Sequence, residues 1–224
     1  MLELFWLGGW IMWPILACSL VGTTIFFERF GRLRAARIRE HTVRAVCHLV
    51  ADRAPERAVS LLDSQDHPEG PCERLLREAL ALGAADRETL ETILAHGVDR
   101  EIKLLTRHFG TLTLLSSLAP LLGFLGTVTG MIQAFQVLQN MGGRVNAAVL
   151  AGGIWEAMLT TAFGLMVAIP LVLMVSFLES RLRGVQIGLE EVAVAYLKAW
   201  AAGRRERPAR GPGGNDEDPP EAQP

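Results

Sequence analysis

Three stretches of this chain are long and apolar enough to cross a lipid bilayer, and they constrain the fold more than any other feature. Residues 1–27 contain one charged residue, Glu3, and residues 111–140 contain none. Residues 147–178 contain only Glu156. A transmembrane helix needs roughly 20 mostly apolar residues, so each stretch is a candidate span. No strand pattern or internal repeat is visible, and we expect an all-α integral membrane protein with three transmembrane helices.

The positions of the basic residues predict how these spans are oriented. No Lys or Arg precedes the first span, and residues 140–146 hold only Arg144. Arginines are frequent directly after the first and third spans, and basic flanks stay in the cytoplasm. We therefore expect a periplasmic N-terminus and a cytoplasmic C-terminus. The acid at position 3 and the lack of preceding basic residues favour a retained span over a cleaved signal peptide.

Outside the spans, the sequence predicts further helices. Segment 28–66 has a helical pattern that breaks near Asp52–Pro55, and a turn at 67–71 precedes a helix from Cys72 to Leu82. Asp86 is typical of an N-cap, and we expect its helix to run without interruption through Arg107 into the second span.

The predicted organisation covers the whole chain. In chain order it consists of transmembrane helix 1 (1–27), a cytoplasmic helical segment (28–110), transmembrane helix 2 (111–139), a periplasmic link (140–146), transmembrane helix 3 (147–178), a cytoplasmic amphipathic helix (179–202) and a disordered tail (203–224). The amphipathic helix has apolar residues at spacings of three and four, and the tail lacks large apolar residues.

Spans two and three each carry a face of small and polar residues. In span two these are Ser116, Pro120, Gly123, Thr127, Gly130 and Ala134, and in span three Ala157, Thr161, Gly164 and Ala168. Small residues let membrane helices approach closely, and threonines can hydrogen-bond across them. The two faces therefore indicate either ordinary helix packing or helices that line a shared axis in a homo-oligomer. Pro120 and Pro170 lie deep in the spans, where each should free a backbone carbonyl for a kink or a polar contact.

Glu156 and Thr160 border the face in span three, and Glu156 is the strongest candidate for function. A carboxylate at membrane depth costs on the order of 3 kcal/mol, which packing alone rarely requires. Burial could keep the carboxyl neutral. Rings of Glu156 and threonine hydroxyls in a narrow lumen would suit a proton path or a docked partner helix.

Two motifs in these spans resemble a known family. Residues 119–131 read APLLGFLGTVTGM, and residues 153–170 read GIWEAMLTTAFGLMVAIP. Both resemble stretches of the MotA/TolQ/ExbB proton channel family, and the three-span layout is similar to its ExbB/TolQ branch. Thr129 and Leu121 depart from residues that are frequent in the family, which leaves the TonB-energising and Tol-Pal subtypes both open.

The resemblance implies a pentamer in the inner membrane of a Gram-negative bacterium. Its pore would hold a single-span partner similar to ExbD or TolR, whose transmembrane aspartate carries protons, with a TonB- or TolA-like protein as the energy transducer. Thr127, Thr161 and Glu156 match the pore positions of the family. The implied function is a stator subunit that converts the proton motive force into mechanical work across the envelope.

Two other classes of function are alternatives to a stator subunit. A membrane scaffold that conducts no ions needs only the small-residue faces. An enzyme is not expected, because the sequence shows no nucleophile–base pair, phosphate loop or metal-ligand spacing, and it suggests no cofactor. Cys18, Cys47 and Cys72 fit packing roles, and a pI near 6.2 gives no reason to expect nucleic acid binding.

Overall fold

The computed structural model describes residues 9–36, 38–64, 69–82, 86–140 and 147–205, apart from the side chains of residues 147–150 and 205. All regular structure in these ranges is helical, as predicted. The helices are α2 (Met12–Ala35), α3 (Glu40–Ala51), α4 (Pro55–Asp63), α5 (Pro71–Ala81), α6 (Arg87–Thr106), α7 (Phe109–Asn140) and α8 (Ala147–Arg205).

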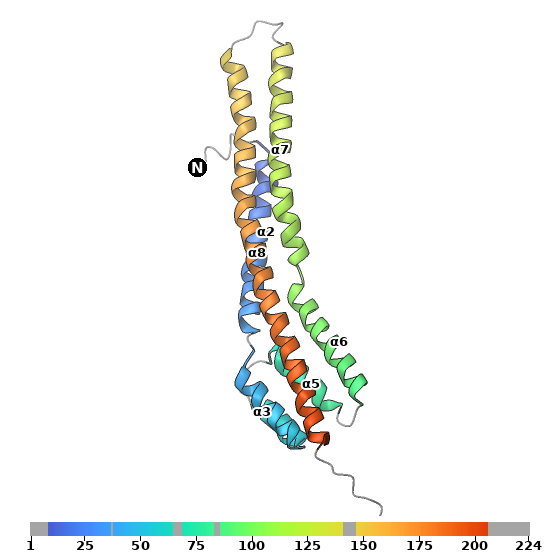
Figure 1. Cartoon of the computed structure of the whole chain (residues 1–224). Coiled ribbons are helices and arrows are strands. Elements are labelled where there is room, and N and C mark those ends of the chain that lie inside the picture. Colours follow the sequence, from blue (N-terminus) through green and yellow to red (C-terminus); the bar gives the residue numbers. More distant parts are fainter. Residues whose placement is uncertain (1–8, 37, 65–68, 83–85, 141–146, 206–224) are drawn as a thin grey trace, which may run out of the picture.

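The helices form two halves that share α8 (Figure 1). In the apolar half, α2 and α7 lie beside the first part of α8. In the charged half, α3 to α6 gather around its last part. α8 has 59 residues, so at 1.5 Å per residue it is about 90 Å long. One continuous helix therefore links the two halves.

Local sequence signals set several helix ends. The Asp86 carboxylate caps α6 by accepting a hydrogen bond from the Thr89 backbone N–H at 3.1 Å. Hydrogen bonds from the Thr89 hydroxyl and backbone lower the pKa of Asp86. Pro55 and Pro71 stand in the first turns of α4 and α5, where the missing N–H needs no partner. The predicted cap, the break near Asp52–Pro55 and the helix from Cys72 are confirmed.

Two predicted continuities are wrong. The chain leaves its helical conformation after Ala35 and returns to it at Glu40, so segment 28–66 has a second interruption. The helix from Arg87 also ends at Thr106, before α7 begins at Phe109. Between them His108 has φ +69°, a left-handed conformation that L-residues rarely adopt. Helical periodicity does not report either interruption, because it describes only residues within a few turns of each other.

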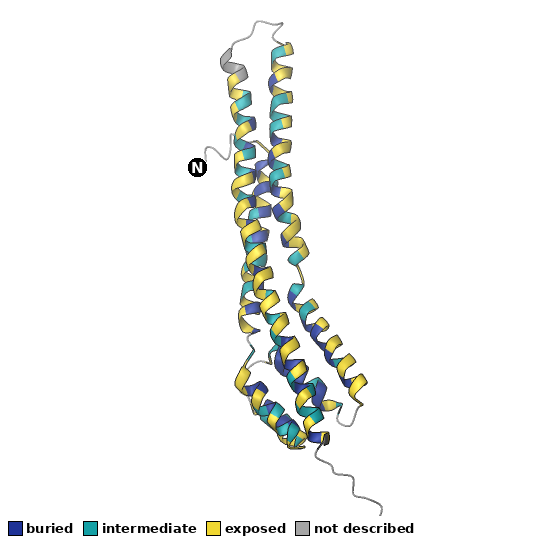
Figure 2. Cartoon of the chain, in the orientation of Figure 1, coloured by how far each residue is buried: buried dark blue, intermediate teal, exposed yellow. Residues whose placement is uncertain are grey.

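The charged half has a conventional core of leucines and valines. Leu75, Leu76, Leu90 and Leu94 are almost completely buried there, together with Leu189 of α8. The predicted amphipathic stripe on α8 faces this core, since Val192 and Tyr196 are also buried in it. Figure 2 shows buried residues along the facing sides of these helices.

The apolar half has the opposite pattern, with large apolar side chains on its outside. Figure 2 shows exposed residues along the outer faces of α7 and α8. They include Leu121, Phe124, Ile132 and Phe135 of α7, and Trp155, Met158, Ile169 and Leu173 of α8. Such a surface needs a lipid or protein cover.

By length and composition, two described stretches are apolar enough to cross a membrane, Arg87–Asn140 and Ala151–Arg204. In the most apolar segment of each stretch, only 28% and 22% of the residues are buried, whereas the core helix of a soluble protein is mostly buried. The first span stays a prediction, because residues 1–8 lie outside the described residues. The predicted link at 141–146 and the predicted tail from residue 206 also lie outside the described residues. Helix α8 ends at Arg205, past the end at 202 that the sequence predicted.

Candidate functional site at the contact between α7 and α8

The small-residue faces of spans two and three pack directly against each other within one chain. A Cβ atom placed on Gly123 would lie 3.1 Å from the Thr161 Cα and 3.3 Å from the Gly164 Cα. A Cβ atom on Gly164 would lie 2.7 Å from the Ala119 carbonyl oxygen. Farther along, Gly130 faces Ala157. We name this contact the α7–α8 seam, and its glycines allow the two backbones to touch.

All three candidate threonines use their hydroxyl protons within the chain. Thr161 donates across the seam to the Gly123 carbonyl at 2.9 Å. Thr160 is buried against Gly126 and donates to the Ala157 carbonyl of its own helix at 2.8 Å. Thr127 donates to the Phe124 carbonyl at 2.6 Å. Each hydroxyl oxygen keeps acceptor capacity, so these groups can still accept a hydrogen bond from a proton donor.

Glu156 lies one helical turn before Thr160, on the same side of α8, and is half-buried. No hydrogen bond or ion pair to its carboxylate occurs among the described residues. One carboxylate oxygen, Oε1, lies 3.5 Å from where a Cβ atom on Gly9 would stand. The fold therefore brings the chain just before α2 over this carboxylate and supplies no basic group of the described chain to neutralise it.

Sequence reasoning missed Gly9, which has φ +68° as the chain enters α2. Glycine adopts this conformation without strain, and here it also leaves space for the Glu156 carboxylate. The adjacent Gly8 and Gly9 were a signal for an unusual backbone, but nothing in the sequence connected them to a residue so far along the chain.

The two prolines occupy different environments. Pro120 is half-buried within α7, one turn before Gly123, whereas Pro170 is exposed within α8. Each removes the N–H that would bond the carbonyl four residues earlier, which belongs to Ser116 or Met166. Both helices continue through their prolines, and a role for either freed carbonyl stays a prediction.

A polar contact at the base of α7 was also missed. Arg29 of α2 is only 1% exposed, and its Nη2 lies 2.8 Å from Nδ1 of His108 and 3.3 Å from Glu28. Because an arginine can only donate, Nδ1 of His108 must accept, which requires it to be unprotonated. This contact ties α2 to the break between α6 and α7. The sequence indicated Arg29 only as one of several basic flanking residues.

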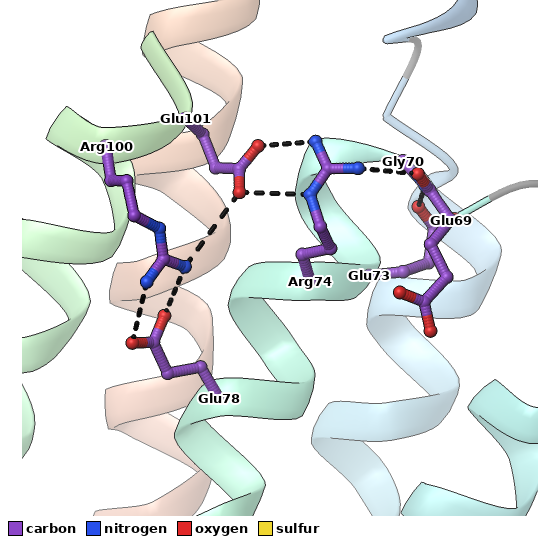
Figure 3. Close-up of polar contacts among 7 residues, drawn as sticks. All are labelled: Glu69, Gly70, Glu73, Arg74, Glu78, Arg100 and Glu101. Carbon is purple, nitrogen blue, oxygen red and sulfur yellow. Dashed lines mark hydrogen bonds and ion pairs between the residues drawn. The ribbon is translucent and has the colours of Figure 1, made fainter. Parts of the chain in front are cut away.

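Charged side chains of the charged half form a network that holds α5 against α6 (Figure 3). The buried carboxylate of Glu101 binds Arg74 through two hydrogen bonds, from Nε at 3.0 Å and from Nη2 at 2.5 Å. These bonds raise the pKa of Arg74. Arg100 pairs with Glu78 beside them at 2.7 Å. The acidic and basic side chains of this network pair with one another, and we assign it to packing.

The described residues show little that could support covalent chemistry or metal binding. No three His, Cys, Asp or Glu residues among them converge on a site for a metal ion. Burial raises the pKa of the Cys47 thiol and raises that of Cys72 to about 12, so both thiols stay protonated and poorly reactive near neutral pH. These observations agree with packing roles for the two cysteines.

Comparisons with known proteins match the region that holds this site. Residues 67–191 match the model of the MotA/TolQ/ExbB proton channel family. The chain is 34% identical over 208 residues to the biopolymer transport protein ExbB-like 1 of Synechocystis sp., covering 89% of this chain and 80% of that protein.

Two further relatives extend the range of organisms. A biopolymer transport protein ExbB homolog of Methanothermobacter thermautotrophicus is 30% identical over 81% of this chain and 63% of its own length. The biopolymer transport protein exbB1 of Vibrio cholerae is 26% identical over 87% of this chain and 86% of its own length. The similarity therefore extends over most of the chain and includes α7 and α8.

Proposed function

Because this chain belongs to the MotA/TolQ/ExbB proton channel family, we propose that it is the pore-forming subunit of a proton-driven motor in a bacterial inner membrane. Such a stator subunit converts the proton motive force into mechanical work across the cell envelope. The family and the apolar helices identify a membrane protein, and the match contains every residue of the α7–α8 seam.

The main support for this proposal is the position of Glu156 within an apolar, membrane-spanning stretch. Glu156 is the single charged residue in residues 147–178, and no described group pairs with it. A carboxylate at this depth costs on the order of 3 kcal/mol, so a chain keeps one where it faces a protein interior or a water-filled path. Thr160 is one turn away on α8 and Thr127 is on the facing helix α7, so the two helices together supply one protonatable group and two hydroxyls.

The described chain forms only part of a proton path, and a partner supplies the rest. We propose a homo-oligomer, a pentamer by family resemblance, around a single-span protein of the ExbD or TolR kind. The transmembrane aspartate of that partner carries the proton, and Thr127, Thr161 and Glu156 of this chain accept or relay it. The exposed apolar faces of α7 and α8 support this assembly, since they are available to neighbouring copies, to the partner helix and to lipid.

The proposed orientation places the charged half in the cytoplasm. The arginines that follow the apolar parts of α2 and α8 would then lie on the inner side, as the positive-inside rule requires. The N-terminus and residues 140–146 would be periplasmic. A TonB- or TolA-like transducer would receive the work on that side.

The proposal is tested by replacing Glu156 with Gln, which keeps the shape of the side chain and removes its proton. The matched control is Glu179→Gln, because Glu179 is an exposed carboxylate of the same helix just beyond the apolar stretch. With the partner co-expressed, proton leak is measured in vesicles with a pH-sensitive dye. We expect Glu156→Gln to abolish the leak and Glu179→Gln to preserve it, with both variants assembled to the same mass.

The threonines give a second test of the same path. The double variant Thr127→Val, Thr161→Val removes two hydroxyls at nearly constant side-chain volume. The control is Thr113→Val, which removes a hydroxyl near the N-terminal end of α7. The double variant should lose partner-dependent leak, and the control should not. Full leak from an assembled double variant would remove the threonines from the path.

The alternative is a scaffold that assembles a complex without conducting ions. It is favoured by the tight α7–α8 seam, which explains the glycines without any proton path. In that case Glu156→Gln is silent, and no proton leak occurs with any co-purified partner.

A further inference from the structure

A pocket lies between the end of α2 and the middle of α8, at the boundary between the two halves. Its volume is about 410 Å³. Its lining includes the apolar residues Phe30, Leu33 and Leu178, and also Arg34 of α2 and Arg181 of α8. Figure 1 shows α2 lying against α8 at this level.

The pocket is at the height where the apolar surface ends. The last exposed large apolar residue is Phe27 on α2 and Phe177 on α8 before the charged residues Glu28 and Glu179 follow. The rings of Phe26 and Phe177 are 6.5 Å apart, which places the two boundaries side by side. In a bilayer, this is the depth of the lipid headgroups of the leaflet beside the charged half.

Neither arginine of the pocket has a carboxylate partner among the described residues. Arg181 lies over the ring of Phe177, 5.4 Å from its centre, and Arg34 is exposed. Arg32, two residues before Arg34, differs because it pairs with Glu28 at 3.1 Å. The pocket therefore has two guanidinium groups with free donors, and each can bind phosphate oxygens through paired N–H bonds.

We propose that this pocket binds the headgroup phosphate of an anionic phospholipid, with Arg34 and Arg181 as its ligands. The hydroxyl of Ser180, which also lines the pocket, can donate a further hydrogen bond. The first part of an acyl chain lies on Phe30 and Leu33 and continues onto the exposed apolar surface of the membrane half. Basic pockets between membrane helices bind anionic headgroups in this way. The proposal depends on the membrane location and not on proton conduction.

Two features favour a lipid over a neighbouring copy of the chain as the occupant: the positive charge of the pocket and its position next to the exposed apolar surface. Two arginines line the pocket, and it lies where the exposed apolar surface ends, so one molecule with an anionic head and an apolar chain can satisfy both parts. A docked protein segment would need an acidic group and an apolar group at the same short spacing.

Two glycines provide a matched pair of variants for testing the pocket. Gly184 lines it, and a Cβ atom there would meet no atom within 4 Å, so Gly184→Leu should fill the pocket without a clash inside the chain. Gly31 has equally open surroundings but does not line the pocket, so Gly31→Leu is the control. Arg34→Gln and Arg181→Gln remove the charges, and Arg183→Gln is the control on the same helix.

The complete oligomer is purified in mild detergent, and phosphatidylglycerol is titrated against phosphatidylcholine while bound lipid is counted by native mass spectrometry. Each arginine near a membrane surface contributes about 1 kcal/mol, which corresponds to about fivefold in affinity. We expect a preference for phosphatidylglycerol that falls about fivefold in each arginine variant and is lost in Gly184→Leu. The controls should retain it.

Equal binding of phosphatidylglycerol by wild type, Gly184→Leu and the double arginine variant would overturn the proposal. So would disulfide cross-linking of Ser180→Cys to a second copy of the chain in native membranes, because a protein would then occupy the site. Free inorganic phosphate is added as a competitor. Displacement of the lipid at millimolar phosphate would show an anion site without lipid specificity and would also overturn the proposal.

Discussion

The two halves of this molecule hold their helices together in different ways. At the α7–α8 seam, glycines bring backbones into contact, and Thr161 bonds a carbonyl of the facing helix. In the charged half, leucines fill a core, and Arg74 binds the buried Glu101. Lipid provides no hydrophobic force between helices, so close van der Waals contact and hydrogen bonds must hold the seam. Water drives apolar side chains together, so the charged half can rely on burial.

The largest expected effect is a break in the seam. In Gly164→Leu the added side chain would start 2.7 Å from the Ala119 carbonyl oxygen and 3.0 Å from the Gly123 Cα. Backbone cannot move aside as a side chain can, so we expect more than about 3 kcal/mol of destabilisation and loss of the assembled protein. Size-exclusion profiles and melting in detergent provide the measurement.

Gly152→Leu is the matched control for this prediction. Gly152 lies on the same helix, and a Cβ atom there meets no atom within 4 Å. The control should assemble and melt like wild type. Similar melting of the two variants would mean that α7 and α8 are not in backbone contact.

A smaller effect is expected where a charge is buried in the charged half. Glu101→Ala leaves the guanidinium of Arg74 without its buried partner. Loss of one member of a buried pair costs about 3–5 kcal/mol, but Arg74 is 39% exposed and can be rehydrated. We therefore expect about 2 kcal/mol, measured by the shift in thermal melting.

Glu91→Ala tests whether exposure decides the size of that effect. Glu91 pairs with Arg87 at 2.7 Å on the surface of the same helix, and exposed pairs contribute less than about 1 kcal/mol. An equal loss of stability in Glu101→Ala and Glu91→Ala would contradict the view that burial decides the size of the effect.

A further effect is expected at alkaline pH from two buried groups of the charged half. Burial raises the pKa of Cys72 from 9.0 to about 12 and the pKa of Tyr196 from 10.0 to about 12. The folded state therefore keeps protons that the unfolded chain releases, and stability is lost as pH rises above 9.0. Each group contributes about 1.4 kcal/mol per pH unit within its own range.

Melting temperatures at pH 8 and pH 10 test this linkage. Wild type should be less stable at pH 10 by about 1.8 kcal/mol, of which about 1.4 kcal/mol comes from Cys72 and the rest from Tyr196. In Cys72→Ala most of this difference should disappear, whatever the substitution does to stability at pH 8. A difference that stays the same in the variant would assign the alkaline loss to other groups.

Helical periodicity predicted individual helices better than the joints between them. Asp86, Pro55 and Pro71 mark helix ends because capping and proline chemistry act over a few residues. The breaks after Ala35 and at His108 carry no comparable signal. His108 adopts a left-handed conformation that residues other than glycine rarely adopt, and a contact with Arg29, far away in sequence, accompanies it.

The candidate site shows the same division. Glu156 was visible from the sequence because a carboxylate in an apolar run is costly wherever the run folds. The spacing of small residues revealed the two small-residue faces. That spacing fitted two arrangements equally well, packing within one chain and lining of a shared axis in a homo-oligomer. The structure places the faces against each other in one chain, and it adds Gly9, which no spacing connected to Glu156.

The sequence by itself determined that this chain is helical, that its apolar residues need a membrane, and that it has the motifs of its family. These properties depend on composition, local spacing and the cost of burying charge, all of which are set residue by residue. Only the tertiary structure decided where helices change direction, which residues approach Glu156, and that Arg34 and Arg181 share a pocket. These outcomes depend on contacts between distant segments, whose energies exist only once the helices are packed.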